Sequence, residues 1–475
     1  MKKTNDKINI IAGKAGIWYT FGNIILKGCL FLTLPIFTRI LSASDFGIYN
    51  TYMAYEGILT AILGLGLYGT VKNAKLDFKE KFNDYMSSVL SFSLLAFLFV
   101  IIVLNVFYPF YYSKLGFSRI IVNCLIFQSF GGYLIYFYGA KLNIEFKYRS
   151  YVVISFFNTI GNIVFSILLI KYIFPNLKYL GRIIGSATPL ILLSMVIIWL
   201  IFSKSMVLYN KEYWKYAIII GLPLVPHAIS HSILTQFDRI MISNMVGKSE
   251  AGIYSYIYTI CTIVNVLIVS LENAWTSWVY VNLNNNEKSI IKEISVKYVL
   301  FFATITIGFI CVMPEVLKII VSEEYREGSN LLIPLTLANY CIFLYMLPVG
   351  IEYYNKKTKY ISIGTIFCAI LNFIFNYFSI KYVGYKSAAY TTLVSYFLLF
   401  LFHYLVSLNL KIKEVYNMKK IIIISIFVFS LSFCLLTIEK YSSLNFIFRY
   451  LIITVILIYY YRNKEFLFKI LKRNK

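Results

Sequence analysis

Lys27 carries the charge that the sequence accommodates least easily, because it lies deep inside the apolar segment 16–41. At 1.5 Å per helical residue its depth is about 16 Å, near the centre of a bilayer. An ammonium group there costs about 2.5–3.5 kcal/mol, so a partner or water must compensate it. One interpretation is a structural ion pair with Glu56, at a similar depth in the next apolar segment. The other is a wet cavity in which Lys27 attracts a diphosphate. The two are compatible, because a phosphate can compete with the carboxylate.

Arg39 and Arg239 stand in near-identical phrases 200 residues apart, Phe-Thr-Arg-Ile and Phe-Asp-Arg-Ile. Each is predicted at the outer end of an apolar segment, where a guanidinium group reaches water or a headgroup. There it can bind a phosphate through two parallel hydrogen bonds. It can equally anchor its helix at the membrane interface or cap the last carbonyl groups. The sequence leaves both interpretations open, while the repetition indicates paired roles.

A polar stripe runs along the apolar segment 214–236, since polar residues recur there at steps of three or four. Such a stripe is expected to face a cavity and not lipid. Its histidines favour hydrogen bonding between helices, or binding of a proton or a sugar, because imidazole titrates near neutral pH. A metal is not expected, because no third ligand accompanies the two imidazoles. Asp238, the last residue of the stripe, is, like Glu56, a candidate for an ion pair or for binding a coupling ion. The stripe consists of His227, Ser230, His231, Thr235 and Asp238.

Membrane-spanning helices must position these residues, since 59% of the chain is hydrophobic, only 14% is charged and the mean hydropathy is +0.73. Too few polar residues remain to cover the surface of a soluble domain. The predicted fold class is therefore an all-α polytopic membrane protein. Apolar runs of about 20 residues, enough to cross about 30 Å of hydrocarbon, predict about fourteen helices. Their approximate spans are 16–41, 47–70, 86–110, 119–142, 151–172, 182–203, 214–236, 250–271, 295–320, 329–351, 360–381, 385–408, 420–438 and 444–461.

The distribution of Lys and Arg predicts that both termini are cytoplasmic. With the N-terminus inside, the inner segments hold 30 of the 45 basic residues. The net charge of +24 then follows from topology and attracts anionic lipid heads, so a nucleic-acid partner is not expected. No cleavable signal peptide is expected, because the start is polar and the first apolar segment is too long.

The loops between the predicted spans are all short, so they leave no room for a soluble catalytic domain. No phosphate-binding P-loop motif occurs in the sequence. Transport driven by ATP on this chain is therefore not expected. The seven cysteines fall in apolar segments without CxxC spacing, which favours packing over disulfides or zinc binding. No cofactor is expected, and the chain is not expected to be an enzyme.

Two internal echoes divide the chain into two related lobes. The arginine phrases lead to Gly-Ile-Tyr at 47–49 and again at 252–254. Ile-Lys-Tyr at 170–172 and 380–382 each follows an asparagine, Asn162 or Asn372. Repeated bundles are typical of secondary transporters. The predicted domains are 1–204 and 205–412, two six-helix lobes, and 413–475, two further spans with a basic tail. Bends are expected at Pro35, Pro189, Pro223 and Pro226.

Motifs along nearly the whole chain carry a family resemblance. They include Gly-Leu-Pro-Leu-Val-Pro-His at 221–227, Phe-Asp-Arg-Ile-Met-Ile at 237–242, Asp-Phe-Gly-Ile-Tyr at 45–49 and Asn-Ala-Trp at 273–275. This set resembles the oligosaccharide flippases of bacterial surface-polysaccharide assembly, in the multidrug/oligosaccharidyl-lipid/polysaccharide exporter superfamily. The resemblance implies a two-lobed helical fold that moves polyprenyl-diphosphate-linked sugar repeat units outward by alternating access. The implied partners are an undecaprenyl-diphosphate-linked oligosaccharide and the bilayer, with a polysaccharide polymerase and glycosyltransferases as further candidates.

Two other functions stay open at this point. A cation-coupled drug or small-molecule antiporter of the same superfamily predicts acidic cavity residues, and Lys27 argues against it. A membrane-embedded polymerase or glycosyltransferase needs a large outer loop or an acid cluster. The acids between Glu315 and Glu327 are the nearest candidate, and they are expected on a solvated loop.

Overall fold

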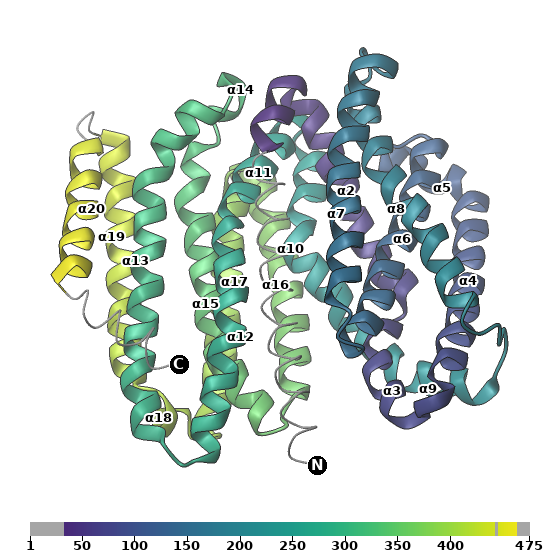
Figure 1. Ribbon diagram of the computed structural model, residues 1–475. Helices are drawn as coiled ribbons and strands as arrows, with labels where there is room; N and C mark the ends of the chain where they lie inside the picture. The colour runs from purple at the N-terminus through teal and green to yellow at the C-terminus, as the bar shows by residue number, and fades with distance from the viewer. Residues whose placement is uncertain (1–32, 442–444, 463–475) are drawn as a thin grey trace. The chain divides into compact units, whose positions relative to one another are not determined.

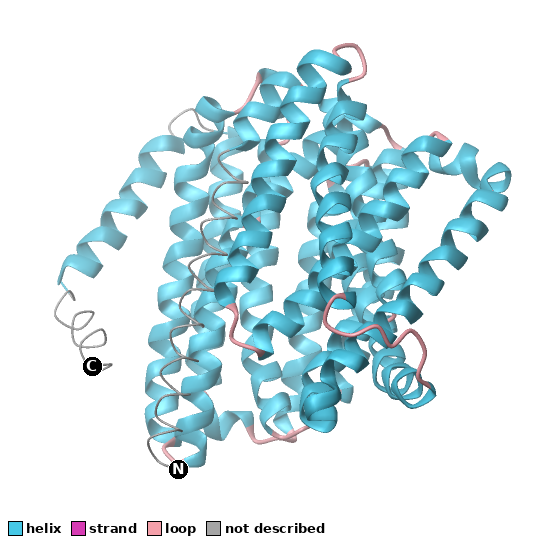
Figure 2. Ribbon diagram, turned by 45° about the vertical axis from the view of Figure 1, so that its right-hand side comes forward, coloured by secondary structure: helices cyan, strands magenta, loops and turns pink. Residues whose placement is uncertain are grey.

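A computed structural model describes residues 33–441 and 445–462, and all regular structure within these ranges is helical (Figures 1 and 2). The predicted all-α fold class is confirmed. Eleven helical segments among the described residues are long and apolar enough to cross a membrane. A helix suits that environment because it bonds its own backbone N–H and C=O groups. The number fourteen stays a prediction, since the first and last predicted spans extend beyond the described ranges and α2, in the predicted span 47–70, is not among the eleven.

The chain forms two compact units. Unit 1 comprises Met1–Ser255 and Thr365–Tyr385, and unit 2 comprises Tyr256–Gly364 and Lys386–Lys475. Helices α11 (Lys248–Cys261) and α16 (Lys359–Val383) each contribute residues to both units. The predicted domains 1–204, 205–412 and 413–475 stay a prediction.

In unit 1, α2 packs against α6 and α10, α8 packs against α6 and α7, and α4 packs against α9. Aromatic rings fill the space between these helices, as where Phe78 lies 4.8 Å from Tyr213 and 5.3 Å from Tyr85, between ring centroids. The helices are α2 (Ala43–Gly64), α3 (Val71–Phe78), α4 (Phe82–Val106), α5 (Tyr108–Leu115), α6 (Arg119–Ile144), α7 (Tyr148–Leu168), α8 (Lys178–Phe202), α9 (Lys211–Gly221) and α10 (Val225–Met245).

Local sequence fixes where α2 begins. Ser42 accepts a hydrogen bond from the Asp45 amide at 3.1 Å, and the Asp45 carboxylate accepts one from the Ser42 amide at 3.4 Å. This reciprocal cap satisfies amide groups that the first helical turn leaves free. The start of α2, which carries the Gly-Ile-Tyr phrase, is therefore held by two polar residues three positions apart.

The break expected at Pro223 and Pro226 is confirmed. Helices α9 and α10 are separated by a 3-10 turn at Leu222–Leu224. Proline lacks the amide hydrogen that an uninterrupted α-helix needs at these positions. Pro189 lies inside the continuous helix α8, so the helical backbone carries on through it.

In unit 2, α15 is the central helix and packs against α12, α13, α17 and α19. The stacked rings of Phe302 and Phe343, with centroids 4.1 Å apart, join α13 to α15. The helices are α12 (Ile263–Asn284), α13 (Lys288–Ile320), α14 (Glu323–Arg326), α15 (Leu332–Tyr354), α17 (Ser387–Leu408), α18 (Ile412–Val415), α19 (Met418–Tyr441) and α20 (Asn445–Arg462).

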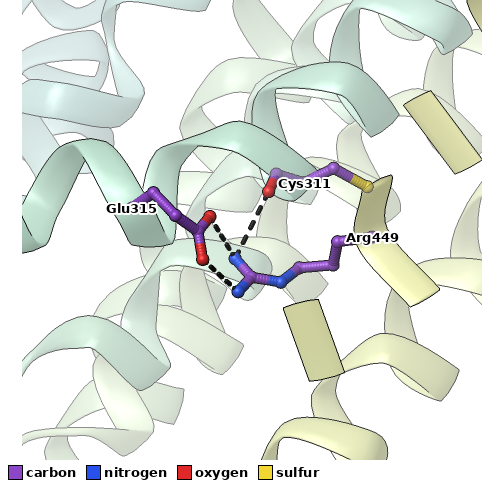
Figure 3. Close-up of polar contacts among 3 residues, drawn as sticks. All are labelled: Cys311, Glu315 and Arg449. Atoms are coloured by element: carbon purple, nitrogen blue, oxygen red, sulfur yellow. Dashed lines mark hydrogen bonds and ion pairs between the residues drawn. The ribbon is translucent and has the colours of Figure 1, made fainter. Parts of the chain in front are cut away.

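A buried ion pair fastens α20 to α13 (Figure 3). Both guanidinium ends of Arg449 contact the Glu315 carboxylate, one of them at 2.8 Å, and the same group donates to the Cys311 carbonyl oxygen at 3.3 Å. The acids between Glu315 and Glu327 were expected on a solvated loop. This expectation is wrong for Glu315, because α13 continues to Ile320 and includes it. Glu323, Glu324 and Glu327 are exposed as expected, although the first two lie in the short helix α14 and not in a loop.

Candidate functional site

Glu56 lies half-buried on α2, and its carboxylate accepts a hydrogen bond from Thr60 at 2.9 Å. Ser129 on α6 donates to the Glu56 carbonyl oxygen at 3.3 Å. Gly132 leaves space for the carboxylate, since a Cβ there would lie 3.0 Å from Oε1. Within residues 33–441 and 445–462, Glu56 forms no ion pair. Lys27 lies outside the described residues, so the Lys27–Glu56 pair stays a prediction.

Helix α10, which carries the polar stripe, packs against α2. Ser232 donates to the carbonyl oxygen of Gly57 at 3.4 Å. His231 is exposed and His227 is half-buried, and no hydrogen-bond partner meets the buried Nδ1 of His227 among the described residues. An imidazole nitrogen in this state is available to a ligand hydroxyl or to a proton. The described residues contain no group of three or more His, Cys, Asp or Glu that could hold a metal ion.

Asp238 ends the stripe inside a buried hydrogen-bonded cluster. Its side chain is 1% exposed and accepts a hydrogen bond from the Tyr254 hydroxyl at 2.6 Å and from the Asn376 amide at 2.7 Å. Asn376 also donates to Asn372 at 3.1 Å. A carboxylate removed from water needs such donors. Helices α10, α11 and α16 therefore meet around one acidic group.

The two repeat arginines occupy different environments. Arg39 is exposed, whereas Arg239 is 7% exposed. The expectation that Arg239 reaches water at a helix end is not met, because α10 continues past it to Met245. Contact of either arginine with substrate stays a prediction.

Arg182 on α8 forms the counterpart of the Asp238 cluster. Its guanidinium group donates to Asn162 and to Ser166, both at 2.6 Å. It also lies over the rings of Phe37 and Tyr49, at 4.0 and 4.3 Å from their centroids. Stacking and hydrogen bonds together hold a cation that is only 7% exposed.

The two clusters use the residues that repeat in the sequence. The Arg182 cluster contains Asn162, and the Asp238 cluster contains Asn372, 210 residues later. The tyrosine of each Gly-Ile-Tyr phrase joins its own cluster. One cluster is built around Arg182 and the other around Asp238, so the two clusters hold opposite charges. Sequence reasoning missed Arg182, although the repeated asparagine was a signal for its location.

The glycines of the repeated phrases bring α2 and α11 into backbone contact. A Cβ on Gly47 would overlap the Lys248 carbonyl oxygen, and a Cβ on Gly252 would overlap the Ala43 carbonyl oxygen. Each clash involves the residue four positions before the opposite glycine. The contact is thus reciprocal, as a two-fold relation between the repeats requires. Only glycine permits so close an approach of two helices.

Comparison with known proteins decides the family. A family model described as "Polysaccharide biosynthesis protein" matches residues 12–276, more than half of the chain. The chain belongs to this family. The capsular polysaccharide biosynthesis protein CapF of Staphylococcus aureus is 23% identical to it over 398 residues, covering 80% of this chain and 96% of CapF.

Solved structures show the fold of this polysaccharide biosynthesis protein. The lipid II flippase MurJ in an inward closed conformation matches with a TM-score of 0.74 at 18% identity, covering 95% of this chain and all of MurJ. An inward-facing multidrug resistance MATE transporter of the MOP superfamily matches at 0.63 and 15% identity, covering 86% of this chain and 98% of the transporter. The chain shares the fold of these two membrane proteins, and the expected resemblance to a polysaccharide-assembly family is confirmed.

Unit 2 holds a buried titratable pair that sequence reasoning missed. The Nδ1 atom of His403 on α17 lies 2.8 Å from Oε1 of Glu352 on α15, and both residues are 0% exposed. Their other polar atoms, His403 Nε2 and Glu352 Oε2, meet no hydrogen-bond partner among the described residues. The contact between them gives each side chain one polar partner inside the apolar interior. The available signal was an acid and a histidine within apolar runs, where each needs a partner.

Proposed function

We propose that this chain is a flippase that translocates polyprenyl-diphosphate-linked oligosaccharide repeat units from the cytoplasmic to the outer leaflet, for assembly of a surface polysaccharide. The observation that carries the proposal is the reciprocal contact of Gly47 and Gly252 between the repeats of a membrane protein from a polysaccharide biosynthesis family. A contact made by backbone alone can open and close without unpairing side chains. That property suits alternating access, in which one face closes while the other opens.

The charged residues divide the handling of the substrate between them. Lys27, which the sequence predicts near the bilayer centre, attracts the diphosphate, and Glu56 holds the ammonium group until phosphate competes for it. The exposed Arg39 meets the diphosphate near the outer mouth. Arg239 joins it only after a rearrangement, because it is buried in the present conformation. His227 and His231 offer imidazole nitrogens to sugar hydroxyls or to protons.

Asp238 is the proposed coupling residue. Its carboxylate already binds the hydroxyl of Tyr254 and the amide of Asn376, on two other helices. Binding of a cation or proton would change how strongly these donors are held. Ion occupancy at this point would therefore bias the packing of α10 against α11 and α16.

The proposal assigns no catalytic step to the chain. In this scheme the two lobes of the chain are the predicted six-helix repeats, and both termini are cytoplasmic. Glycosyltransferases supply the lipid-linked repeat unit on the inner face, and a polymerase consumes it on the outer face.

Deletion of the gene in its own host tests this function. We expect loss of surface polysaccharide and accumulation of the lipid-linked repeat unit on the inner leaflet, measured by protection of its sugar from an external glycosidase. The wild-type gene should restore both. Normal surface polysaccharide together with sensitivity to organic cations would instead support a small-molecule antiporter and reject the flippase.

A further inference from the structure

We infer that unit 2 binds the phosphate head of an anionic glycerophospholipid in a pocket formed by α13, α17, α18 and α19. The pocket has a volume of about 630 Å³. Three lysines line it, one from α13, one from α18 and one from α19. The lining residues that matter here are Lys292, Lys413, Lys419, Tyr404 and Asn417.

The three lysines are free to meet an anion. None of them forms an ion pair within the part of the chain that the structure describes, and no carboxylate lines the pocket. The nearby acids are already engaged, since Glu414 binds Lys288 at 2.8 Å and Glu293 binds Lys297 at 2.5 Å. The pocket therefore has an uncompensated positive potential, which a phosphate group would neutralise.

The shape of the pocket selects a lipid over a soluble phosphate. Met418, Ile422 and Ile423 of α19 form an apolar wall directly beside the lysines. The wall continues along α19 as exposed apolar side chains, with Ile423 57%, Ile426 59% and Phe427 62% exposed. A phosphate at the lysines would place attached acyl chains along this face. A free inorganic ion would leave the wall unused.

The pocket also lies where anionic lipids concentrate. The segments 288–297 and 411–420, which contain all three of its lysines and the start of α19, are predicted on the cytoplasmic side from their Lys and Arg content. Juxtamembrane lysine clusters attract anionic headgroups on this side. The lipid would tie α19, and α20 packed on it, to α13. This site is independent of the proposed transport function.

Lipid retention by the full-length wild-type protein gives the first test. The purified protein is placed in nanodiscs of phosphatidylcholine containing a small fraction of phosphatidylglycerol, then released and examined by native mass spectrometry. We expect retention of phosphatidylglycerol well above its share of the bilayer. Retention in proportion to bilayer composition would overturn the inference even if every variant failed to fold. Displacement of the lipid by added inorganic phosphate alone would overturn the assignment to a lipid.

The triple variant Lys292→Gln, Lys413→Gln, Lys419→Gln tests the residues. It should retain at least about tenfold less phosphatidylglycerol than the wild type, since lysines near a lipid surface act together. The triple Arg variant at the same positions should retain the lipid, because the charge is kept. Equal retention by the Gln variant and the wild type would reject the pocket as the site.

A matched control removes the same charge elsewhere. Lys204, Lys211 and Lys215 are exposed residues of unit 1. Their triple Gln variant should retain phosphatidylglycerol as the wild type does. A loss equal to that of the pocket variant would show that retention follows net charge alone, and would reject a defined site.

Discussion

Removing either partner of the Arg449–Glu315 pair should loosen α20 from α13, and the structure sets the size of the effect. The Arg449 side chain is 6% exposed and that of Glu315 is 27% exposed. Breaking a buried pair from one side costs about 3–5 kcal/mol, because the remaining charge stays buried without its partner. The partial exposure of Glu315 places the expectation at the lower end, about 3 kcal/mol.

Cys311 provides a native reporter of this loosening. It is 0% exposed, and its carbonyl oxygen accepts a hydrogen bond from Arg449. In a chain with the other six cysteines replaced, a membrane-permeant maleimide should label Cys311 only when α20 moves away. A loss of about 3 kcal/mol corresponds to roughly a hundredfold faster labelling. We expect this rise for Glu315→Gln and for Arg449→Met.

The double variant separates the ion pair from general damage. Glu315→Gln with Arg449→Met leaves no unpaired charge, so its labelling rate should return to within about tenfold of the wild type. Lys297→Met is the control on the same helix, because the Lys297–Glu293 pair is 38% and 69% exposed. It should change labelling by no more than about twofold. Labelling of the double variant at the product of the two single effects would refute the pair as the fastening contact.

Three further predictions follow from the site. Gly47→Val should abolish transport or folding, because its Cβ would overlap a backbone carbonyl of α11. Gly57→Ala should be tolerated, since only one side-chain atom would lie within 4 Å of the added Cβ. Equal activity of the two variants would contradict the backbone contact. Arg182→Lys should lower the free energy of unfolding by about 2–3 kcal/mol, because lysine cannot keep both hydrogen bonds and both ring contacts. An unchanged melting temperature would refute this role of Arg182. Lys27→Ala should abolish transport while membrane abundance stays within about twofold. Loss of Lys27→Ala protein from the membrane, with rescue by adding Glu56→Ala, would show a structural ion pair instead.

Much of the architecture could be predicted from the sequence, because membrane helices depend on local properties. Length and apolarity located the spans, and Pro223 and Pro226 predicted the break between α9 and α10. The Gly-Ile-Tyr repeat predicted related halves. The structure adds that Gly47 and Gly252 contact each other through backbone, which no single segment encodes.

The polar clusters could be predicted only in part, because their partners come from distant segments. Asp238 was a candidate from its place in the stripe, but its donors lie on α11 and α16. Arg182 and the His403–Glu352 pair depend on helix packing that spacing within one segment does not specify. Arg239 was expected at a helix end because the span was assigned too short. Buried polar residues in a membrane protein are thus better sought in pairs than singly.

Translocation by the purified chain tests the central claim most directly. Proteoliposomes with a fluorescent polyprenyl-diphosphate oligosaccharide in the outer leaflet would be treated with a membrane-impermeant quencher. With the wild-type chain, we predict that a fraction of the fluorescence becomes protected as lipid reaches the inner leaflet. The Gly57→Ala chain should behave in the same way, and a chain carrying Gly47→Val that is folded and inserted should give no protection. Full quenching with folded, correctly inserted wild-type protein would contradict the account.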